Sequence, residues 1–493
     1  MYKKFVDRLL GNTLYFKVLW AILVLLKMNP IISRMTSPLF IFLIIYGSLI
    51  IFYDIFGDVK TLQNKYSIFL LMFLVFIGIS TIINYKNGLI DNIKYFISIA
   101  IQFIVIGRID INRSRDDIAK EMGLINKIII TGVTLASLIS LGLILFGLNG
   151  SYEVASDSSS TGKLLYYYGV AYGGRLVGIY SNPNRLGAFV TISIICSIIN
   201  LGLFKNRLYM KVIYLFSIII NFICLILSGS RNSILALHLC AFITVFLLLV
   251  YKNKNVRDNF RKYLKIVVAS SICILMLYSS VVAVRKVLTN VLENIERPQG
   301  ESQVVLNLDR TIKIDKSNIE KVSSGRLTIW QAGLNTAKLN PVFGVGGAKL
   351  DEIVINNWNG NRIPSGIEKG GLHNIYLETL VSYGLPTFLI LICFLIILAI
   401  DFIKNIFTIL HEDQYQYFLG LYIIAMIGLI ASNNLFESMI LYFTNLASFV
   451  FVLYMGYAMY FTQWDSSNKG DNMLYRIWKN WIRQLRLILR SEV

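Results

Sequence analysis

Long hydrophobic runs separated by polar connections dominate the pattern along the chain. Most runs cover roughly 18 to 25 residues, the length that an α-helix needs to cross about 30 Å of hydrocarbon. They are too long and too uniformly apolar to be strands of a membrane β-barrel. The pattern therefore predicts an all-α polytopic membrane protein with about twelve transmembrane helices. We place these helices near 10–29, 37–56, 66–84, 93–108, 124–148, 185–203, 209–228, 232–251, 264–284, 374–403, 415–434 and 439–461.

Composition and charge agree with this class. The chain has 493 residues, of which 56% are hydrophobic and only 15% are charged, a balance that water-soluble chains of this length do not reach. The formal net charge of +19 would suggest a nucleic-acid partner for a soluble protein. In a membrane protein it fits basic cytoplasmic connections and contact with anionic membrane lipids, so no nucleic acid is expected as a partner.

Basic connections between the runs set the expected orientation. With twelve helices and both termini cytoplasmic, the basic connections at 108–120, 205–211 and 252–262 all lie on the cytoplasmic side, as the positive-inside rule requires. The first run is interrupted by Lys17 and Lys27, and an interfacial amphipathic helix would look similar. We keep it as a transmembrane helix because the charge bias of the connections favours this count. It also lacks the cleavage site of a signal peptide, so we expect it to stay as an anchor.

The same topology divides the chain into four parts. Residues 1–284 hold nine helices and a first outer loop at about 149–184, and residues 285–373 form a large extracytoplasmic loop. Residues 374–461 hold the last three helices. Residues 462–493 are a cytoplasmic basic amphipathic tail, expected as a helix on anionic headgroups over 471–493, with a merely solvated tail as the alternative.

Motifs of nucleotide-using and metal-dependent soluble enzymes are absent from the sequence. It contains no G-x-x-x-x-G-K-[ST], no H-E-x-x-H, no G-x-S-x-G and no D-x-D. A cytosolic nucleotide substrate is therefore not expected. Ionisable residues at the outer membrane face become the functional candidates, because charge at that depth is costly.

Four ionisable residues stand out at the expected outer face. Arg175 lies in YGGRLVGIYSNPN, Arg231 in LSGSRNS and Arg326 in SSGRLTIWQAG, while His373 immediately precedes the tenth helix. Guanidinium groups bind phosphate oxygens through two parallel hydrogen bonds and stay charged near lipid. A histidine can take a proton from a hydroxyl at neutral pH. Together they predict a site that binds a diphosphate and removes a proton.

Structural explanations for the same residues stay open. Arg231 can be an arginine that snorkels to the interface, Arg175 a surface arginine, and Arg326 a helix-start residue paired with a neighbouring acid. The other two histidines, His238 and His411, are expected to be structural. In the first outer loop, Asn182 is expected to cap the sixth helix and Pro183 to start it.

At these residues the sequence resembles the O-antigen ligase and polysaccharide polymerase family. The pieces are RLVGIYSNPNRLGAF, SGSRNSILAL, GRLTIWQAGLNTAKLNPVFGVGGAKL and HNIYLETLVSYGLPTFLI, which occur in the family's order between about residues 175 and 390. The resemblance implies a membrane glycosyltransferase architecture of the GT-C-like kind. It also implies transfer of a glycan from a polyprenyl diphosphate carrier to an acceptor hydroxyl, with inversion at the anomeric carbon and with no cofactor or metal.

The resemblance assigns roles to the four candidates. Arg231 and Arg326 would hold the diphosphate and stabilise the charge that develops on the leaving group, with help from Arg175. His373 would act as the general base or position the acceptor.

Three further candidates lie in the segment that follows His373. Glu378 is the second choice for the base, and Asn374 and Tyr376 are placed to position a sugar hydroxyl. Helix capping and interfacial anchoring are the alternative roles for this group.

The favoured function is a polymerase of undecaprenyl-diphosphate-linked oligosaccharide repeat units, which builds a surface polysaccharide such as O-antigen or capsule. It would work on the outer face of the bacterial cytoplasmic (inner) membrane, with the lipid-linked donor and acceptor, membrane lipids, a chain-length regulator and a flippase as partners. A ligase that moves the finished glycan to a lipid or protein is the first alternative. A flippase is disfavoured because the candidate charges gather at the outer face, and a scaffold has no feature in its favour.

Overall fold

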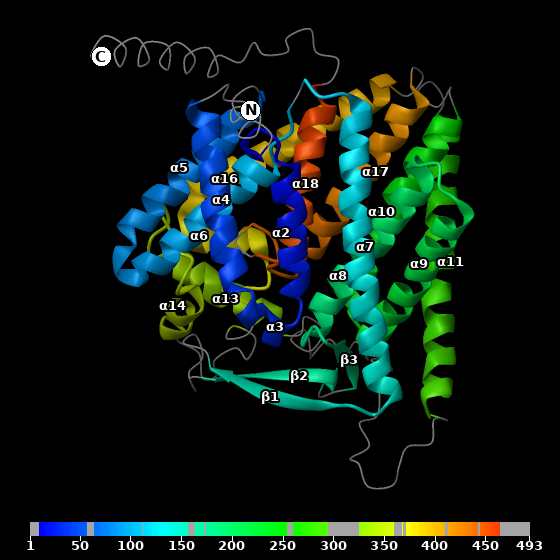
Figure 1. Cartoon of the computed structure of the whole chain (residues 1–493), viewed down its shortest axis with the longest axis horizontal. Coiled ribbons are helices and arrows are strands. Elements are labelled where there is room, and N and C mark those ends of the chain that lie inside the picture. The colour runs from blue at the N-terminus through cyan, green and yellow to red at the C-terminus, as the bar shows by residue number, and fades with distance from the viewer. Residues whose placement is uncertain are drawn as a thin grey trace.

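Long helices form a bundle, and a small three-stranded sheet lies across one end of it (Figure 1). Within the residues that the structure describes, nine helices are long and apolar enough to cross a membrane, and three shorter apolar helices accompany them. The expected class of all-α polytopic membrane protein is confirmed. The computed structural model describes residues 9–56, 64–110, 112–155, 163–171, 174–253, 260–293, 325–358, 367, 371–409, 413–441 and 444–463.

These apolar helices coincide with the predicted segments. Successive helices run in alternating directions, so the start of α2 and the end of α18 lie at the same end of the bundle (Figure 1). The predicted helix over 471–493 and the turn that holds His411 lie outside the described residues. The helices are α2 (Leu14–Leu26), α4 (Ser37–Phe56), α5 (Ser67–Ile83), α6 (Leu89–Ile101) with its π-helical continuation η3 (Gln102–Ile106), α7 (Arg115–Leu145), α8 (Pro183–Leu203), α9 (Leu208–Ser228), α10 (Arg231–Lys252), α11 (Phe260–Glu293), α16 (Ile375–Ile409), α17 (Gln414–Asn433) and α18 (Leu446–Phe461).

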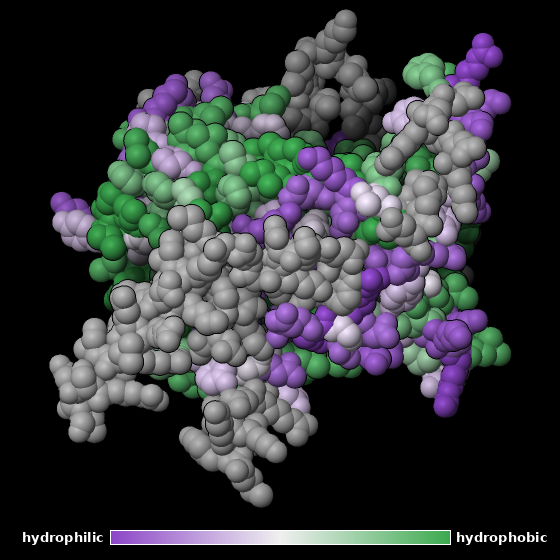
Figure 2. Space-filling model, turned by 90° about the horizontal axis from the view of Figure 1, so that it is seen from above, coloured by the Kyte–Doolittle hydropathy of each residue, from purple (hydrophilic) through white to green (hydrophobic). Residues whose placement is uncertain are grey.

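The two ends of the bundle differ in character. One end, which we call the basic face, carries the connections from α6 to α7, from α8 to α9 and from α10 to α11. Figure 2 looks onto this face and shows hydrophilic side chains gathered across it, with hydrophobic surface beside them. The other end, the sheet face, carries the three strands. Described basic residues of the basic face are Arg108, Arg113, Arg115, Lys205, Arg207, Lys211, Lys252, Arg261 and Lys262.

The first helix, α2, belongs to the core of the bundle. Its Lys17 is fully buried and donates hydrogen bonds to Glu121 Oε1 at 2.9 Å and to the Arg108 carbonyl at 3.0 Å. Glu121 is buried as well and also pairs with Arg113. Because a buried lysine is tolerated when its charge is paired and hydrogen-bonded, Lys17 does not exclude α2 from the interior. The burial of Trp20 likewise argues against an interfacial helix.

A three-stranded antiparallel sheet occupies the first outer loop, and the sequence analysis did not predict it. Its strands are β1 (Gly150–Ala155), β2 (Lys163–Ala171) and β3 (Arg175–Gly178), in the order β1-β2-β3. Tyrosine and valine favour strands, and the short runs that contain them were hidden among glycines and serines. Strand β3 leads directly into the start of α8.

The large predicted loop contains helical structure. Helix α11 continues to Glu293, so its last residues lie within the segment predicted as this loop. Two short helices follow in its second half, α13 (Arg326–Ala337) and α14 (Leu350–Asn356). Their apolar side chains form one cluster with the start of α16.

The segment 341–348, between α13 and α14, is tied to the turn between α5 and α6. This turn includes the short 3-10 helix η2 (Tyr85–Asn87). Asn84 Nδ2 donates to the Gly344 carbonyl at 3.1 Å, and Asn87 Nδ2 donates to the Val345 carbonyl at 2.9 Å. The amide of Gly347 donates to Asn92 Oδ1 at 3.0 Å. Side-chain amides thus fix the loop to the N-terminal helices.

The same segment supplies hydrogen-bond partners to the backbone at a break in α16. Gly384 has a φ of 83°, and the helical hydrogen bonds are interrupted around it. The amides of Val345 and Gly346 donate to the carbonyls of Val381 and Ser382 at 3.0 and 2.9 Å. Broken helices persist at membrane depth only when protein groups satisfy the freed backbone, and here segment 341–348 supplies those groups.

Candidate active site

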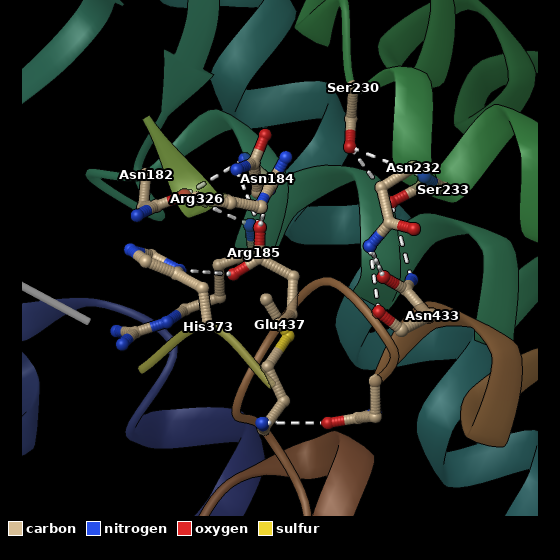
Figure 3. A network of polar contacts seen from close by, with 12 residues as sticks. Asn182, Asn184, Arg185, Ser230, Asn232, Ser233, Arg326, His373, Asn433 and Glu437 are labelled. Carbon is tan, nitrogen blue, oxygen red and sulfur yellow. Dashed lines mark hydrogen bonds and ion pairs between the residues drawn. The ribbon is translucent and has the colours of Figure 1, made fainter. Parts of the chain in front are cut away.

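A buried carboxylate, Glu437, is the centre of a polar cluster at the sheet face. Its Oε1 accepts hydrogen bonds from Arg326 Nη2 at 3.0 Å and from Asn184 Nδ2 at 2.7 Å. Its Oε2 lies 3.3 Å from His373 Nδ1. Figure 3 shows these three side chains converging on Glu437. One carboxylate therefore joins α8, α13 and the turn before α16.

Glu437 lies in an irregular segment between α17 and α18. The sequence analysis placed the last helix at 439–461, but α18 begins at Leu446. Asn445 caps that helix, because its side chain accepts a hydrogen bond from the Ser448 amide at 3.0 Å. Residues 434–441 consequently remain non-helical, and this conformation lets Glu437 reach the cluster.

Arg175 is linked to the same cluster through Asn184. Its Nη2 donates to Asn184 Oδ1 at 2.7 Å, and its Nε donates to the Ser228 carbonyl at the end of α9, also at 2.7 Å. The next residue after Asn184, Arg185, is attracted electrostatically by Glu437. Three arginines therefore surround Glu437. Arg326 contacts the carboxylate directly, Arg175 is linked to it through Asn184, and Arg185 interacts with it through charge alone.

The start of α8 places Asn184 and Arg185. Asn182 accepts hydrogen bonds from the amides of Asn184 at 2.8 Å and Arg185 at 3.1 Å, and Pro183 occupies the first helical turn. The predicted cap at Asn182 and start at Pro183 are confirmed. A proline suits this position because its missing N–H would have no helical partner there.

Arg231 starts α10 in the SGSRNS stretch. Gly229 ends α9 in the left-handed conformation with φ of 57°, and Ser230 caps α10. Asn232 Nδ2 donates to the Asn433 carbonyl at 2.7 Å and so holds the end of α17. The Arg231 side chain itself is exposed at the first residue of the helix. The structure brings Arg175, Arg326 and His373 together at Glu437, whereas Arg231 stands beside this cluster.

Arg326 is held on an aromatic surface. Its guanidinium carbon lies 5.9 Å from the centre of the Phe436 ring, and Trp330 of the same helix stacks on Phe436 at 6.2 Å. Trp330 Nε1 also donates to the Leu372 carbonyl at 3.1 Å. The Arg326 Nε is buried and has no hydrogen-bond partner. A buried donor without a partner is costly, so an acceptor that reached this nitrogen would remove that cost.

His373 has a strained backbone. Its φ is 50°, and the only other described non-glycine residues with positive φ are Ser181 and Leu441. Ser181 directly precedes the cap of α8, and Leu441 follows Glu437 by four residues. Such conformations cost about 1–3 kcal/mol each and concentrate at functional sites. All three therefore belong to segments that build this cluster.

The three candidates that follow His373 support its turn. Asn374 Oδ1 accepts hydrogen bonds from the amides of Tyr376 and Leu377, both at 3.0 Å, and so caps α16. The Tyr376 hydroxyl donates to the Ala431 carbonyl at 3.4 Å. Glu378 is buried and accepts from the Leu372 amide at 3.4 Å. Their described contacts hold the first turn of α16 in place and do not include Glu437.

The pKa values of two acids near His373 shift in opposite directions. Burial alone would raise the pKa of the Glu437 carboxyl, but His373 and Arg326 outweigh burial and hold that pKa below its usual 4.5. Burial raises the pKa of Asp351 in α14 to about 6, although His373 opposes this shift. At neutral pH Glu437 is therefore an anion, as its contacts with Arg326 and His373 require.

Glu437, Asn184 and Arg185 were missed by the sequence analysis. The available signal was weak: Glu437 is an acidic residue in NNLFESMI, a short stretch between two apolar runs at the expected outer face. Asn184 and Arg185 were read only as parts of a helix start. Within the described residues, no group of three or more histidine, cysteine, aspartate or glutamate side chains is placed to hold a metal ion.

The fold and this site define a multi-pass membrane protein with a cationic cluster at one face. Residues 216–392 match a protein-family model described as O-antigen ligase, which confirms the resemblance. The match supports a glycosyl-transferring membrane protein, in the broad sense, of the O-antigen ligase and polymerase type. The match includes Arg231, Arg326 and His373 and excludes Arg175 and Glu437. No curated protein matches the chain.

Proposed function

We propose that this protein is a polymerase that joins undecaprenyl-diphosphate-linked repeat units into a surface polysaccharide at the outer face of the bacterial cytoplasmic membrane. The cluster of Arg326, His373 and Glu437 carries the proposal. It combines phosphate-binding and proton-accepting groups at the end of a membrane-spanning bundle, where the headgroup of a lipid diphosphate would lie. The enzyme would invert the anomeric carbon and would need no metal.

Three arginines are assigned to the diphosphate. Arg326 offers the unpartnered Nε, Arg231 is exposed at the start of α10, and Arg175 lies behind Asn184. Guanidinium groups aimed at developing negative charge stabilise a leaving phosphate. In this proposal Arg326 and Arg231 contact the diphosphate, and Arg175 supports them.

His373 is assigned the acceptor hydroxyl. The hydroxyl oxygen would form a bond to the anomeric carbon while the bond from that carbon to the phosphate oxygen breaks, and His373 would take the hydroxyl proton. The polyprenyl diphosphate would leave with the electron pair of the broken bond. Glu437 lies 3.3 Å from His373 Nδ1, so it would orient the imidazole and stabilise its protonated form.

The orientation and the division of the chain remain part of this proposal. The basic face would be cytoplasmic with both termini, according to the positive-inside rule. The four parts 1–284, 285–373, 374–461 and 462–493 are retained with that orientation. The sheet, α13 and α14 would then lie outside, on the side where the lipid-linked repeat units are used.

A gel analysis of the host polysaccharide tests the function. The gene would be deleted and complemented with the wild-type gene or an empty vector, and surface polymer and lipid-linked intermediates would be sized. Single repeat units that accumulate on the lipid in the deletion strain would support a polymerase. Full-length polymer stranded on the carrier would assign the ligase instead, and unchanged polymer would contradict both.

Arg326→Lys is expected to lower activity by about 10²–10³-fold, the effect of losing one donor to a developing oxyanion. Lysine keeps the charge but lacks the planar pair of donors. The measurement is polymer formation from lipid-linked repeat units by purified protein. Arg207→Lys, an exposed arginine of the basic face, is the matched control and should retain activity. Wild-type activity in Arg326→Lys would show that charge alone suffices there.

Glu437→Gln is expected to lower kcat by about 10²-fold or more, because the cations would lose their common anion and the imidazolium would lose its stabilising partner. Glutamine retains an acceptor oxygen for Asn184 and Arg326, so the fold should persist. The pH profile of the remaining activity is the specific readout. Its acid limb should move to lower pH, since His373 would lose a proton more readily. An unchanged profile would assign Glu437 a purely structural role.

A further inference from the structure

Tyrosines gather on one face of the outer sheet. Tyr152 of β1 is paired directly with Tyr166 of β2, and their rings stack with centres 5.8 Å apart at an interplanar angle of 22°. Tyr168 lies on the same face because side chains alternate along a strand. Its ring covers the backbone at Gly150. We call Tyr152 and Tyr166 the tyrosine pair.

The tyrosine pair faces the site and not away from it. The Tyr152 hydroxyl lies 3.3 Å from Ser181 Oγ, and Tyr166 interacts electrostatically with Arg185. Ser181 and Arg185 flank the helix start that presents Asn184 to Glu437. Strand β2 also pairs with β3, which begins at Arg175. The pair is therefore continuous with the proposed diphosphate site through two connections.

The chemistry of the pair fits a saccharide. Each ring is only half-buried, so part of it remains accessible beside the site. The C–H face of a pyranose ring stacks on a flat aromatic ring, and a phenolic hydroxyl can both donate to and accept from sugar hydroxyls. A polyprenyl chain would require a fully apolar surface, and a membrane anchor would direct its tyrosines away from the bundle.

We infer that Tyr152 and Tyr166 form a glycan-binding subsite that holds the sugar units next to the reacting linkage. The inference rests on the proposed function, since it assumes a lipid-linked glycan at the neighbouring arginines. A subsite of this kind retains the growing chain between successive additions. Its loss would therefore shorten the polymer more strongly than it slows the transfer of a single unit.

The test measures saccharide binding and polymer length with full-length protein in detergent. The probe is the repeat-unit oligosaccharide released from the host's own polysaccharide, without lipid or diphosphate. Tyr166→Leu removes the flat ring but keeps an apolar strand residue. We expect about 10-fold weaker binding, consistent with the loss of roughly 1.4 kcal/mol of stacking, and a shorter polymer.

Tyr167→Leu is the matched control, because this residue belongs to the same strand and points to the opposite face. Equal binding by Tyr166→Leu and wild type, or equal loss in Tyr167→Leu, would overturn the subsite. If wild type binds the saccharide, only the subsite fails in these cases. If wild type itself binds no saccharide, the proposed function fails as well.

Discussion

Replacement of His373 by alanine is expected to reduce chain extension by about 10²–10⁴-fold, the usual contribution of a general base. The side chain is only partly buried and its described ion pair is with Glu437, so truncation should leave the helices inserted. Loss of the imidazole would leave the acceptor hydroxyl with no base at this position. The measurement is the rate of polymer formation from lipid-linked repeat units, normalised to the amount of protein in the membrane.

His238→Ala is the control for removal of a histidine. His238 lies inside α10, and its Nδ1 is 2.7 Å from the Ile234 carbonyl one turn earlier. It should lose some thermal stability and keep its rate per molecule. A His373→Ala protein with wild-type rate and polymer length would remove His373 from the mechanism. Glu378, buried beneath the same turn, would then be the next residue to test.

Gly384→Ala is expected to have the largest effect on stability, about 3 kcal/mol or more. Gly384 has a φ of 83°, which is strained for any residue with a Cβ atom. A Cβ atom there would also collide with the Val342 carbonyl. The segment 341–348 would be forced away from the break in α16. We expect a lower melting temperature in detergent and little protein in the membrane.

Gly142→Ala provides the matched control. Gly142 lies in α7, and a Cβ atom added there would have no neighbour within 4 Å. Alanine favours a helix over glycine by about 1 kcal/mol, so this variant should be as stable as wild type or slightly more stable. If Gly384→Ala melts like Gly142→Ala, the break in α16 does not depend on glycine, and the role of segment 341–348 is overestimated.

The helices were predictable because their signal is local. An apolar run long enough to span a bilayer is visible without knowledge of its neighbours. A local pattern cannot explain Lys17, because its partner Glu121 is 104 residues away. Only the structure explains why a lysine in the first run is compatible with a buried helix. The start of α18 was misplaced for a related reason: residues 439–441 continue the apolar run but are not helical, and α18 begins at Leu446.

The cationic residues of the site were predictable from the sequence, but the carboxylate at its centre, Glu437, was not. Arginines and a histidine near membrane ends are conspicuous in a sequence with few charges. The residue that gathers them, Glu437, is 253 residues from Asn184 and 111 residues from Arg326. No spacing rule connects such distant positions. The sheet was missed because its tyrosines and valines lie among glycines and serines, which favour turns and loops.

Glu437 gives the site a counter-ion of its own. In the structure Arg326 is already partly neutralised by this carboxylate, so under the proposed function an arriving diphosphate would have to exchange with an internal anion. A small anion with few oxygens gains little from that exchange, whereas a diphosphate can contact several arginines at once. The return of Arg326 to Glu437 would in turn favour departure of the spent lipid carrier. In the proposed function, the carboxylate would thus make entry of the diphosphate less favourable and assist its release.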